Sequence, residues 1–194
     1  MAGDVLQITE LKREELMAQQ FDLALQFYAI AGDDDLSRQQ HREITQKMAV
    51  NAVDLALPAI VESVNAGDLQ TVALVAPLRG ALALVTPETK TYLREQLDKL
   101  GYHHVGIELW AQGIKRHPEE NRAEVYFEYG YDGKDNSATH AVIMDWGIAT
   151  GLTTVVSAKA LKEVGVDYGR MTVIGMALAE KGRALIEANC VDGD

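Results

Sequence analysis

Residues 139–154, THAVIMDWGIATGLTT, decide the fold of this chain. They begin with a continuous apolar run at 141–144, which is typical of a strand buried on both faces. Asp145 ends that run, and a turn leads to the segment TGLTT at 150–154. From residue 155 to residue 162 the apolar residues recur at helical spacing. The stretch therefore predicts a strand with an acidic tip, a loop rich in hydroxyl groups, and a helix.

This order of elements suits the binding of an anion. The free N–H groups and the dipole at a helix start attract phosphate, glycine lets the backbone approach, and threonine hydroxyls add donors. A carboxylate at a strand end can take ribose hydroxyls or a metal ion at the carboxyl edge of a parallel sheet. The same spacing also fits an ordinary strand–helix turn, in which the threonines cap the helix and Asp145 is solvated.

The rest of the chain reads as alternating strands and helices behind a helical N-terminus. Helical spacing of apolar residues predicts long helices at 9–31 and 37–65. Further patterns predict strands at 71–75, 104–110, 124–129 and 171–178, and helices from 81, at 86–99 and at 179–188. We therefore expect an α/β fold, a mostly parallel twisted sheet flanked by helices. A helical segment at 1–66 would pack on a core at 67–194, making one structural domain overall.

Composition limits the kind of partner. The 194 residues carry a net charge of −11 and have a pI of about 4.9, which speaks against nonspecific binding to nucleic acid or to an anionic membrane. Cys190, the single cysteine, cannot form an intramolecular disulfide. The sequence contains no run of eighteen apolar residues, and its first fifteen residues lack the regions of a signal peptide. We expect a soluble cytoplasmic protein.

Three segments follow predicted strands and should gather at the carboxyl edge of the sheet, at 76–80, 110–122 and 145–154. The first contains Arg79 next to Gly80, and an arginine offers a planar fork of donors to phosphate oxygens. The second is a polar connection with Lys115, Arg116 and His117. By themselves these cations are equally compatible with solvated turns, and we expect His117 to be a surface residue and not a general base.

Taken together, the three segments resemble motifs of the type I phosphoribosyltransferases, over about residues 70–190. DWGIATG at 145–151 resembles the phosphoribosyl-pyrophosphate loop, most closely that of the uracil phosphoribosyltransferase branch, with Trp146 in the place of a second acid. PLRG at 77–80 and the stretch at 113–129 resemble the turn and the arginine-bearing segment near the pyrophosphate.

The resemblance implies a set of site residues. Asp145, Arg79 and Arg116 would be catalytic, with Asp145 on the ribose hydroxyls. The 5′-phosphate would lie on the loop made of Ala149, Thr150, Gly151, Leu152, Thr153 and Thr154. The pyrophosphate would be bound by Arg79, Gly80, Arg116 and Lys134. Mg²⁺ would arrive with the substrate, and no residue set is implied as its own metal site.

The implied activity is transfer of ribose 5-phosphate from phosphoribosyl pyrophosphate to a nucleobase or a related heterocycle, with release of pyrophosphate. Family members are commonly oligomers, so a homo-oligomer is expected. The chain lacks the C-terminal segment with which the branch reads uracil, so uracil specificity does not follow. Leu152, Trp146 and that missing segment leave open a non-catalytic relative, acting as a phosphosugar or nucleotide sensor or as an assembly subunit.

Overall fold

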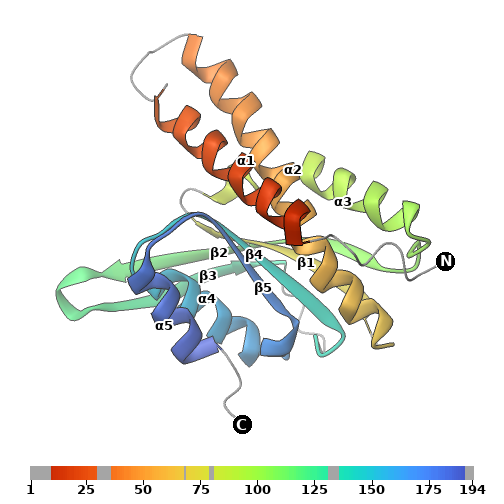
Figure 1. The fold of residues 1–194 in the computed structure, drawn as a ribbon. Coiled ribbons are helices and arrows are strands. Elements are labelled where there is room, and N and C mark those ends of the chain that lie inside the picture. Colours follow the sequence, from red (N-terminus) through yellow and green to blue (C-terminus); the bar gives the residue numbers. More distant parts are fainter. Residues whose placement is uncertain (1–9, 30–35, 68, 79–80, 131–135, 191–194) are drawn as a thin grey trace.

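A five-stranded sheet forms the centre of the computed structural model, which describes residues 10–29, 36–67, 69–78, 81–130 and 136–190 (Figure 1). Its strand order is β3-β2-β1-β4-β5. The strands are β1 (Thr71–Leu78), β2 (Gly106–His117), β3 (Arg122–Tyr129), β4 (Thr139–Ile148) and β5 (Met171–Leu178). β1 pairs in parallel with β2 and β4, β4 pairs in parallel with β5, and β3 runs antiparallel to β2. The predicted fold class, a mostly parallel α/β sheet, is confirmed.

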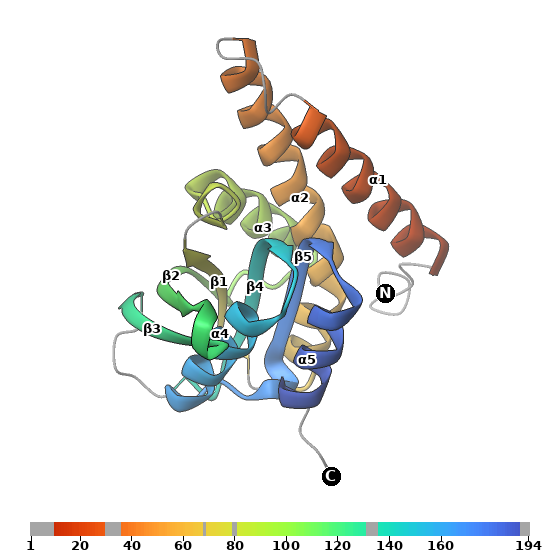
Figure 2. The same ribbon diagram turned by 90° about the vertical axis from the view of Figure 1, so that its left-hand side faces the viewer.

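Helices cover both faces of the sheet, as the two ribbon views show (Figures 1 and 2). One face carries α1 (Glu10–Ala29), α2 (Leu36–Asn65) and α3 (Pro87–Lys99), and the other carries α4 (Leu152–Glu163) and α5 (Glu180–Cys190). Thr86 caps α3 as expected, because its Oγ1 accepts a hydrogen bond from the Thr89 N–H at 3.3 Å. The helices thus form a three-layer arrangement around the buried strands.

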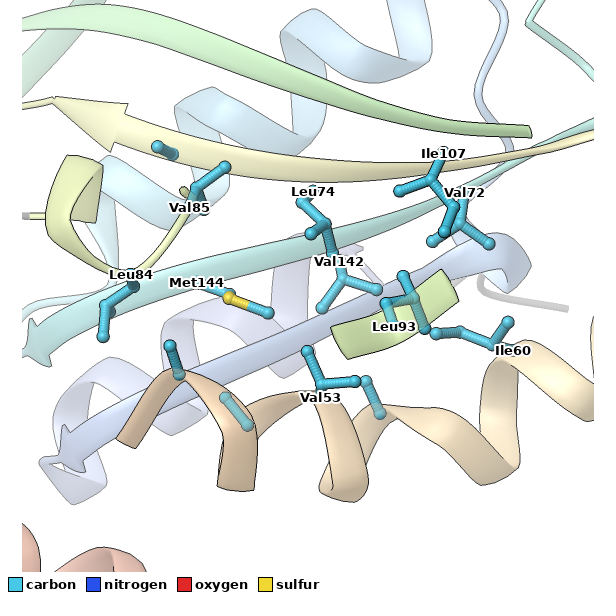
Figure 3. Close-up of a cluster of buried hydrophobic side chains, with 14 of the residues drawn as sticks. Val53, Ile60, Val72, Leu74, Leu84, Val85, Leu93, Ile107, Val142 and Met144 are labelled. Atoms are coloured by element: carbon cyan, nitrogen blue, oxygen red, sulfur yellow. The ribbon is translucent and has the colours of Figure 1, made fainter. Parts of the chain in front are cut away.

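Each face of the sheet has its own hydrophobic cluster, and β4 contributes to both. Val142 and Met144 lie in the cluster with Val53 of α2 (Figure 3), whereas Ala141 and Ile143 lie in the cluster with α4. Successive side chains of a strand point to opposite faces. Continuing this alternation places residue 145 on the face of α4 and residue 146 on the face of α2.

The two predicted N-terminal helices are confirmed as α1 and α2. α2 buries Met48, Ala52 and Ile60 against the sheet, so it shares the core of the strands. The predicted division into a helical segment at 1–66 and a core at 67–194, within one structural domain, stays a prediction. Within the described residues, one helical segment, Gln39–Asn65, is long and apolar enough to cross a membrane, but half of it is buried inside the protein. Helices in the core of a protein meet the same two criteria, so this segment does not establish a membrane span.

Several predicted boundaries are wrong because sheet pairing extends the strands. The segment 111–122 is not a polar connection: β2 continues to His117, and after the short turn Pro118–Glu120 the chain returns as β3. β1 likewise runs on to Leu78, beside Gly113 of β2. Local apolar pattern could not reveal this, because the hydrogen bonds come from a neighbouring strand and do not require apolar side chains.

The central stretch also differs in detail from its prediction. β4 does not end at the acidic residue; it continues to Ile148, which pairs with Leu178 of β5. α4 begins at Leu152, three residues before the predicted helix start, so two of the loop threonines lie in its first turn. The segment that begins at residue 81 is a single short turn of 3₁₀ helix, Ala81–Ala83.

Candidate functional site

Asp145 lies near the carboxyl end of β4, opposite Gly175 of β5, and its side chain is half-buried. The Trp146 N–H donates a hydrogen bond to the Asp145 Oδ1 at 2.8 Å. Burial raises the pKa of the Asp145 carboxyl, while the backbone N–H groups of Trp146 and Gly147 and the charge of Arg116 oppose that rise. The carboxylate is thus held by backbone donors and faces a cation.

Arg116 joins the second predicted segment to the third. Its Nε donates a hydrogen bond to the Thr153 Oγ1 at 2.7 Å, which connects β2 with the first turn of α4. The same guanidinium acts on the Asp145 carboxyl. Arg116 therefore meets two residues expected at the same site, Asp145 and Thr153, which follow it by 29 and 37 residues in the sequence.

The α4 N-terminus supplies the unpaired donors of this site. Gly151 precedes the helix with a φ of 76°, a conformation that disfavours residues with a Cβ. Thr150 is exposed, and its Oγ1 accepts a long hydrogen bond of 3.5 Å from the Leu152 N–H. Thr153 and Thr154 are buried, and the Thr154 Oγ1 has no hydrogen-bond partner among the residues that the structure describes. A buried hydroxyl without a partner costs free energy unless a ligand or water satisfies it.

α5 packs against this loop at Gly182, a residue that the sequence analysis did not single out. A Cβ on Gly151 would lie 2.5 Å from the Gly182 carbonyl oxygen, and a Cβ on Gly182 would lie 2.7 Å from the Ile148 carbonyl oxygen. The Ala179 N–H also donates a hydrogen bond to the Ile148 carbonyl at 3.0 Å. Two glycines face to face let the backbone of α5 approach the loop, an arrangement that neither sequence segment signals by itself.

Trp146 does not share the face of Asp145. It stacks on Phe27 of α1, with 4.4 Å between the ring centroids and 30° between the planes, and it packs against the cluster that contains α2. The tryptophan therefore does not line the face of the sheet on which Asp145 lies. Because side chains alternate along β4, its neighbour in sequence faces the other way.

The remaining predicted residues divide into two groups. Ala149, two residues before the glycine of the loop, is exposed, and Leu152, directly after that glycine, is half-buried. Arg79, Gly80 and Lys134 lie outside the described residues, so their roles stay predictions. His117 is partly buried, and its Nε2 lies 3.1 Å from the Glu124 Oε1, a partner that the sequence did not reveal. It is part of the β2–β3 hairpin and not of the loop.

In the described part of the chain, no group of three or more His, Cys, Asp or Glu side chains could hold a metal ion. Mg²⁺ in phosphate sites is commonly bound by one or two carboxylates together with the phosphates of the substrate and water. Asp145 supplies one such carboxylate beside the helix start. This single carboxylate fits a magnesium ion that would arrive with a polyphosphate.

Comparison with known proteins identifies solved structures with a similar fold but does not assign the chain to a family. No protein-family model matches the chain, and no curated protein matches it. The AQ2163 protein from Aquifex aeolicus has a similar structure, with a TM-score of 0.53 and 19% identity over 89% of this chain and 77% of that one. At that identity the likeness concerns the fold alone.

Two further solved structures are more distant. The APRTase from Giardia lamblia, complexed with 9-deazaadenine, has a TM-score of 0.43 and 13% identity, and covers 71% of this chain and 74% of its own. The hypoxanthine-guanine phosphoribosyl transferase of L. donovani has a TM-score of 0.47 and 15% identity, over 72% of this chain and 74% of its own. At these scores neither likeness carries an argument about the site.

Proposed function

We propose that this chain binds phosphoribosyl pyrophosphate at the α4 N-terminus and transfers its ribose 5-phosphate to a nucleobase or a related heterocycle. The observation that carries the proposal is the meeting of Arg116, Thr153 and Asp145 around a helix start. The sequence resemblance to the type I phosphoribosyltransferases names the substrate, and the geometry of the site supports it.

The 5′-phosphate would lie on the loop at 149–154. The first N–H groups of α4 have no partner within the helix, and the dipole favours a phosphate there. The buried Thr154 hydroxyl would gain the acceptor that it lacks among the described residues. Gly182 and Gly151 would hold the loop against α5 so that its donors stay in position. Fixed donors of this kind need little reorganisation when the ligand arrives.

Asp145 and Arg116 would act on the other two parts of the substrate. The carboxylate would accept hydrogen bonds from the ribose hydroxyls and oppose the positive charge that develops on the sugar. The guanidinium would neutralise pyrophosphate as its bond to the anomeric carbon breaks and a nitrogen of the acceptor forms the new bond. Arg79, Gly80 and Lys134 would contribute to the pyrophosphate end by resemblance alone. A magnesium ion bound with the substrate would share that negative charge.

The acceptor is proposed only as a base-like heterocycle, because no described residue reads its identity. We also propose a cytoplasmic location. A non-catalytic sensor remains the second candidate. Trp146, which occupies the position of a second acid in the resemblance, stacks on Phe27, so this position offers the site no second carboxylate.

Isothermal titration with phosphoribosyl pyrophosphate and Mg²⁺ tests the proposal. We expect micromolar binding by the wild type and weaker binding by Arg116→Ala. Arg122→Ala is the matched control, because this arginine of the same hairpin is exposed and pairs with Glu120 and Glu124. Absence of binding by a folded wild type would contradict the proposal. A screen of bases for pyrophosphate release then separates an enzyme from a sensor, which would bind the substrate without turnover.

A further inference from the structure

Helix α4 is joined to strand β2 by a second polar connection, one turn along the helix from the contact between Arg116 and Thr153. The Ser157 Oγ donates a hydrogen bond to the Gln112 Oε1. In return, the Gln112 Nε2 donates to the Ser157 carbonyl oxygen at 3.4 Å. The helix whose start forms the candidate site is therefore also held by side-chain hydrogen bonds below that site.

Both side chains of this second connection are 0% exposed. A buried polar side chain costs free energy unless it is paired, and an apolar pair of similar shape can be equally stable. A serine inside a helix can also bond the carbonyl one turn before it. The Ser157 hydroxyl bonds to a neighbouring strand instead. The stability of the core alone does not require such a pair.

The pair supplies a directional contact that the rest of the α4 interface lacks. Ala158 and Leu161 attach the second half of the helix to the sheet through apolar packing, in the cluster that contains Ile143. Apolar packing is non-directional, whereas a hydrogen bond restricts both distance and angle. Thr153 and Ser157 lie one turn apart and so share one side of the helix. Bonds from both to β2 restrict the rotation of α4 and its place along the strand.

Gln112 is itself held in place. β2 pairs with β1 on one side and with β3 on the other, so its backbone lies inside the sheet. Gln112 lies directly opposite Glu128 of β3. Burial raises the pKa of the Glu128 carboxyl, and a hydrogen bond with the Gln112 side chain opposes that rise. The amide thus has partners on two elements and gives α4 a fixed point of attachment.

We propose that Gln112 is a positioning residue for the phosphate-binding loop. Through Ser157 it fixes the rotation of α4, and so it holds the N–H groups at the helix start in one arrangement. Because the ligand is the one proposed above, this role rests on the proposed function. Donors fixed in advance need little reorganisation, so the gain appears in affinity for the 5′-phosphate. Gln112 is fully buried and acts through the helix, without contact to the substrate.

Hydrogen exchange tests this role without a ligand. The double variant Gln112→Met/Ser157→Ala replaces both partners with apolar side chains, so its stability should stay close to that of the wild type. The Val155 N–H donates to the Gly151 carbonyl at 2.9 Å and closes the first turn of α4. It should exchange about tenfold faster in the variant, whereas the amides of β1 should keep their wild-type rates. Unchanged exchange at Val155 would overturn the role of Gln112.

Calorimetry separates positioning from a general loss of structure. The double variant should bind phosphoribosyl pyrophosphate and ribose 5-phosphate about tenfold more weakly, because both carry the 5′-phosphate. Its affinity for magnesium pyrophosphate should not change, since Arg116 stays on β2. Equal losses for all three ligands would mean that the pair only supports the fold, and would overturn the proposal.

A buried pair elsewhere in the protein provides the matched control. The Asn51 Nδ2 donates a hydrogen bond to the Gln20 Oε1 at 2.8 Å, and both side chains are buried. They join α1 to α2, on the other face of the sheet from α4 (Figure 1). Gln20→Met/Asn51→Ala should therefore bind all three ligands like the wild type. Should Gln112→Met/Ser157→Ala not fold, Gln112→Met alone replaces it, because the serine can then bond the carbonyl one turn before it.

The two proposals fail in different ways. A folded wild type that binds none of the three ligands would contradict the proposed function, and the exchange rate of the Val155 N–H would still decide whether Gln112 positions α4. Binding by the wild type, together with the same affinity in the double variant, would overturn the role of Gln112 and leave the proposed function standing.

Discussion

The Arg116 Nε donates a hydrogen bond to the Thr153 Oγ1 over 2.7 Å and so joins strand β2 to the first turn of helix α4. The bond lies beside Asp145, whose carboxyl experiences the charge of the same guanidinium. It holds together two segments that the sequence places 37 residues apart. Among the residues that the structure describes, the two terminal nitrogens of this guanidinium have no hydrogen-bond acceptor, so they can donate to a ligand.

Replacing Thr153 with valine removes the acceptor while keeping a β-branched side chain of similar size. We expect Thr153→Val to lower the free energy of unfolding by about 0.5–1.5 kcal/mol, the usual net value of one hydrogen bond. Binding of phosphoribosyl pyrophosphate should weaken as well, because Arg116 loses its position. Urea denaturation and titration measure the two effects. Thr150→Val is the comparison, since Thr150 is exposed and its Oγ1 accepts a long hydrogen bond from the Leu152 N–H. It should leave stability nearly unchanged.

Substitution of Gly182 by alanine tests the close approach of α5 to the loop. Helix propensity alone predicts that alanine is more stable than glycine inside a helix by about 1 kcal/mol. The structure predicts the opposite sign, because the new Cβ would lie 2.7 Å from the Ile148 carbonyl oxygen and 3.1 Å from that of Ala149. We expect a loss of about 1–3 kcal/mol and weaker phosphate binding.

Gly169→Ala serves as the control for that substitution, because a Cβ there would meet nothing within 4 Å. Thermal denaturation of both variants gives the sign directly. A Gly182→Ala protein that is more stable than the wild type would show that α5 does not press on the loop.

We expect Asp145→Asn to raise the free energy of unfolding and to lower the affinity for phosphoribosyl pyrophosphate. Burial is the largest influence on this carboxyl and raises its pKa, so the ionised form is disfavoured where it lies. We expect the neutral amide to increase the free energy of unfolding at neutral pH. Affinity for phosphoribosyl pyrophosphate should fall about tenfold to a hundredfold, because bonds to a charged acceptor are lost. Unchanged affinity in calorimetry would remove Asp145 from the proposed site.

His140 predicts a pH dependence of stability far from the candidate site. The ring is 2% exposed, and its Nδ1 and Nε2 lie 2.7 Å and 2.9 Å from the hydroxyls of Ser63 and Thr172. Burial, assisted by the charge of Arg170, lowers its pKa from 6.5 to about 4. Between these values the unfolded chain binds the proton and the folded chain does not. Stability is therefore complete above about pH 6.5 and falls as the pH drops towards 4.

The loss over that interval should amount to roughly 3 kcal/mol from His140 alone. His140→Gln keeps a side chain that can both donate and accept hydrogen bonds, but it does not titrate. Its free energy of unfolding, followed by urea denaturation from pH 7 to pH 4, should therefore show a shallower slope than that of the wild type. Equal slopes in the two proteins would mean that the histidine is already protonated in the fold.

The sequence by itself determined the elements whose signals are local. The apolar runs at 71–75 and 141–144 belong to buried strands, Thr86 and Pro87 open a helix, and the strand at 171–178 has the predicted bounds. These features depend on each segment's own side chains, through burial and capping. The same local reading placed Asp145 on a buried strand and a glycine-containing turn between that strand and a helix.

Only the tertiary structure decided how those elements end and which faces meet. β2 and β4 run past their apolar cores because neighbouring strands supply hydrogen bonds, and backbone pairing leaves little trace in side-chain pattern. Trp146 and Asp145 face opposite sides by the alternation along β4, but only the fold shows that the tryptophan stacks on Phe27 of α1. The need for glycine at position 182 becomes visible only in its close approach to Gly151, thirty-one residues earlier in the sequence. Contacts between distant segments depend on the packing of the whole chain, and no window of the sequence contains both partners.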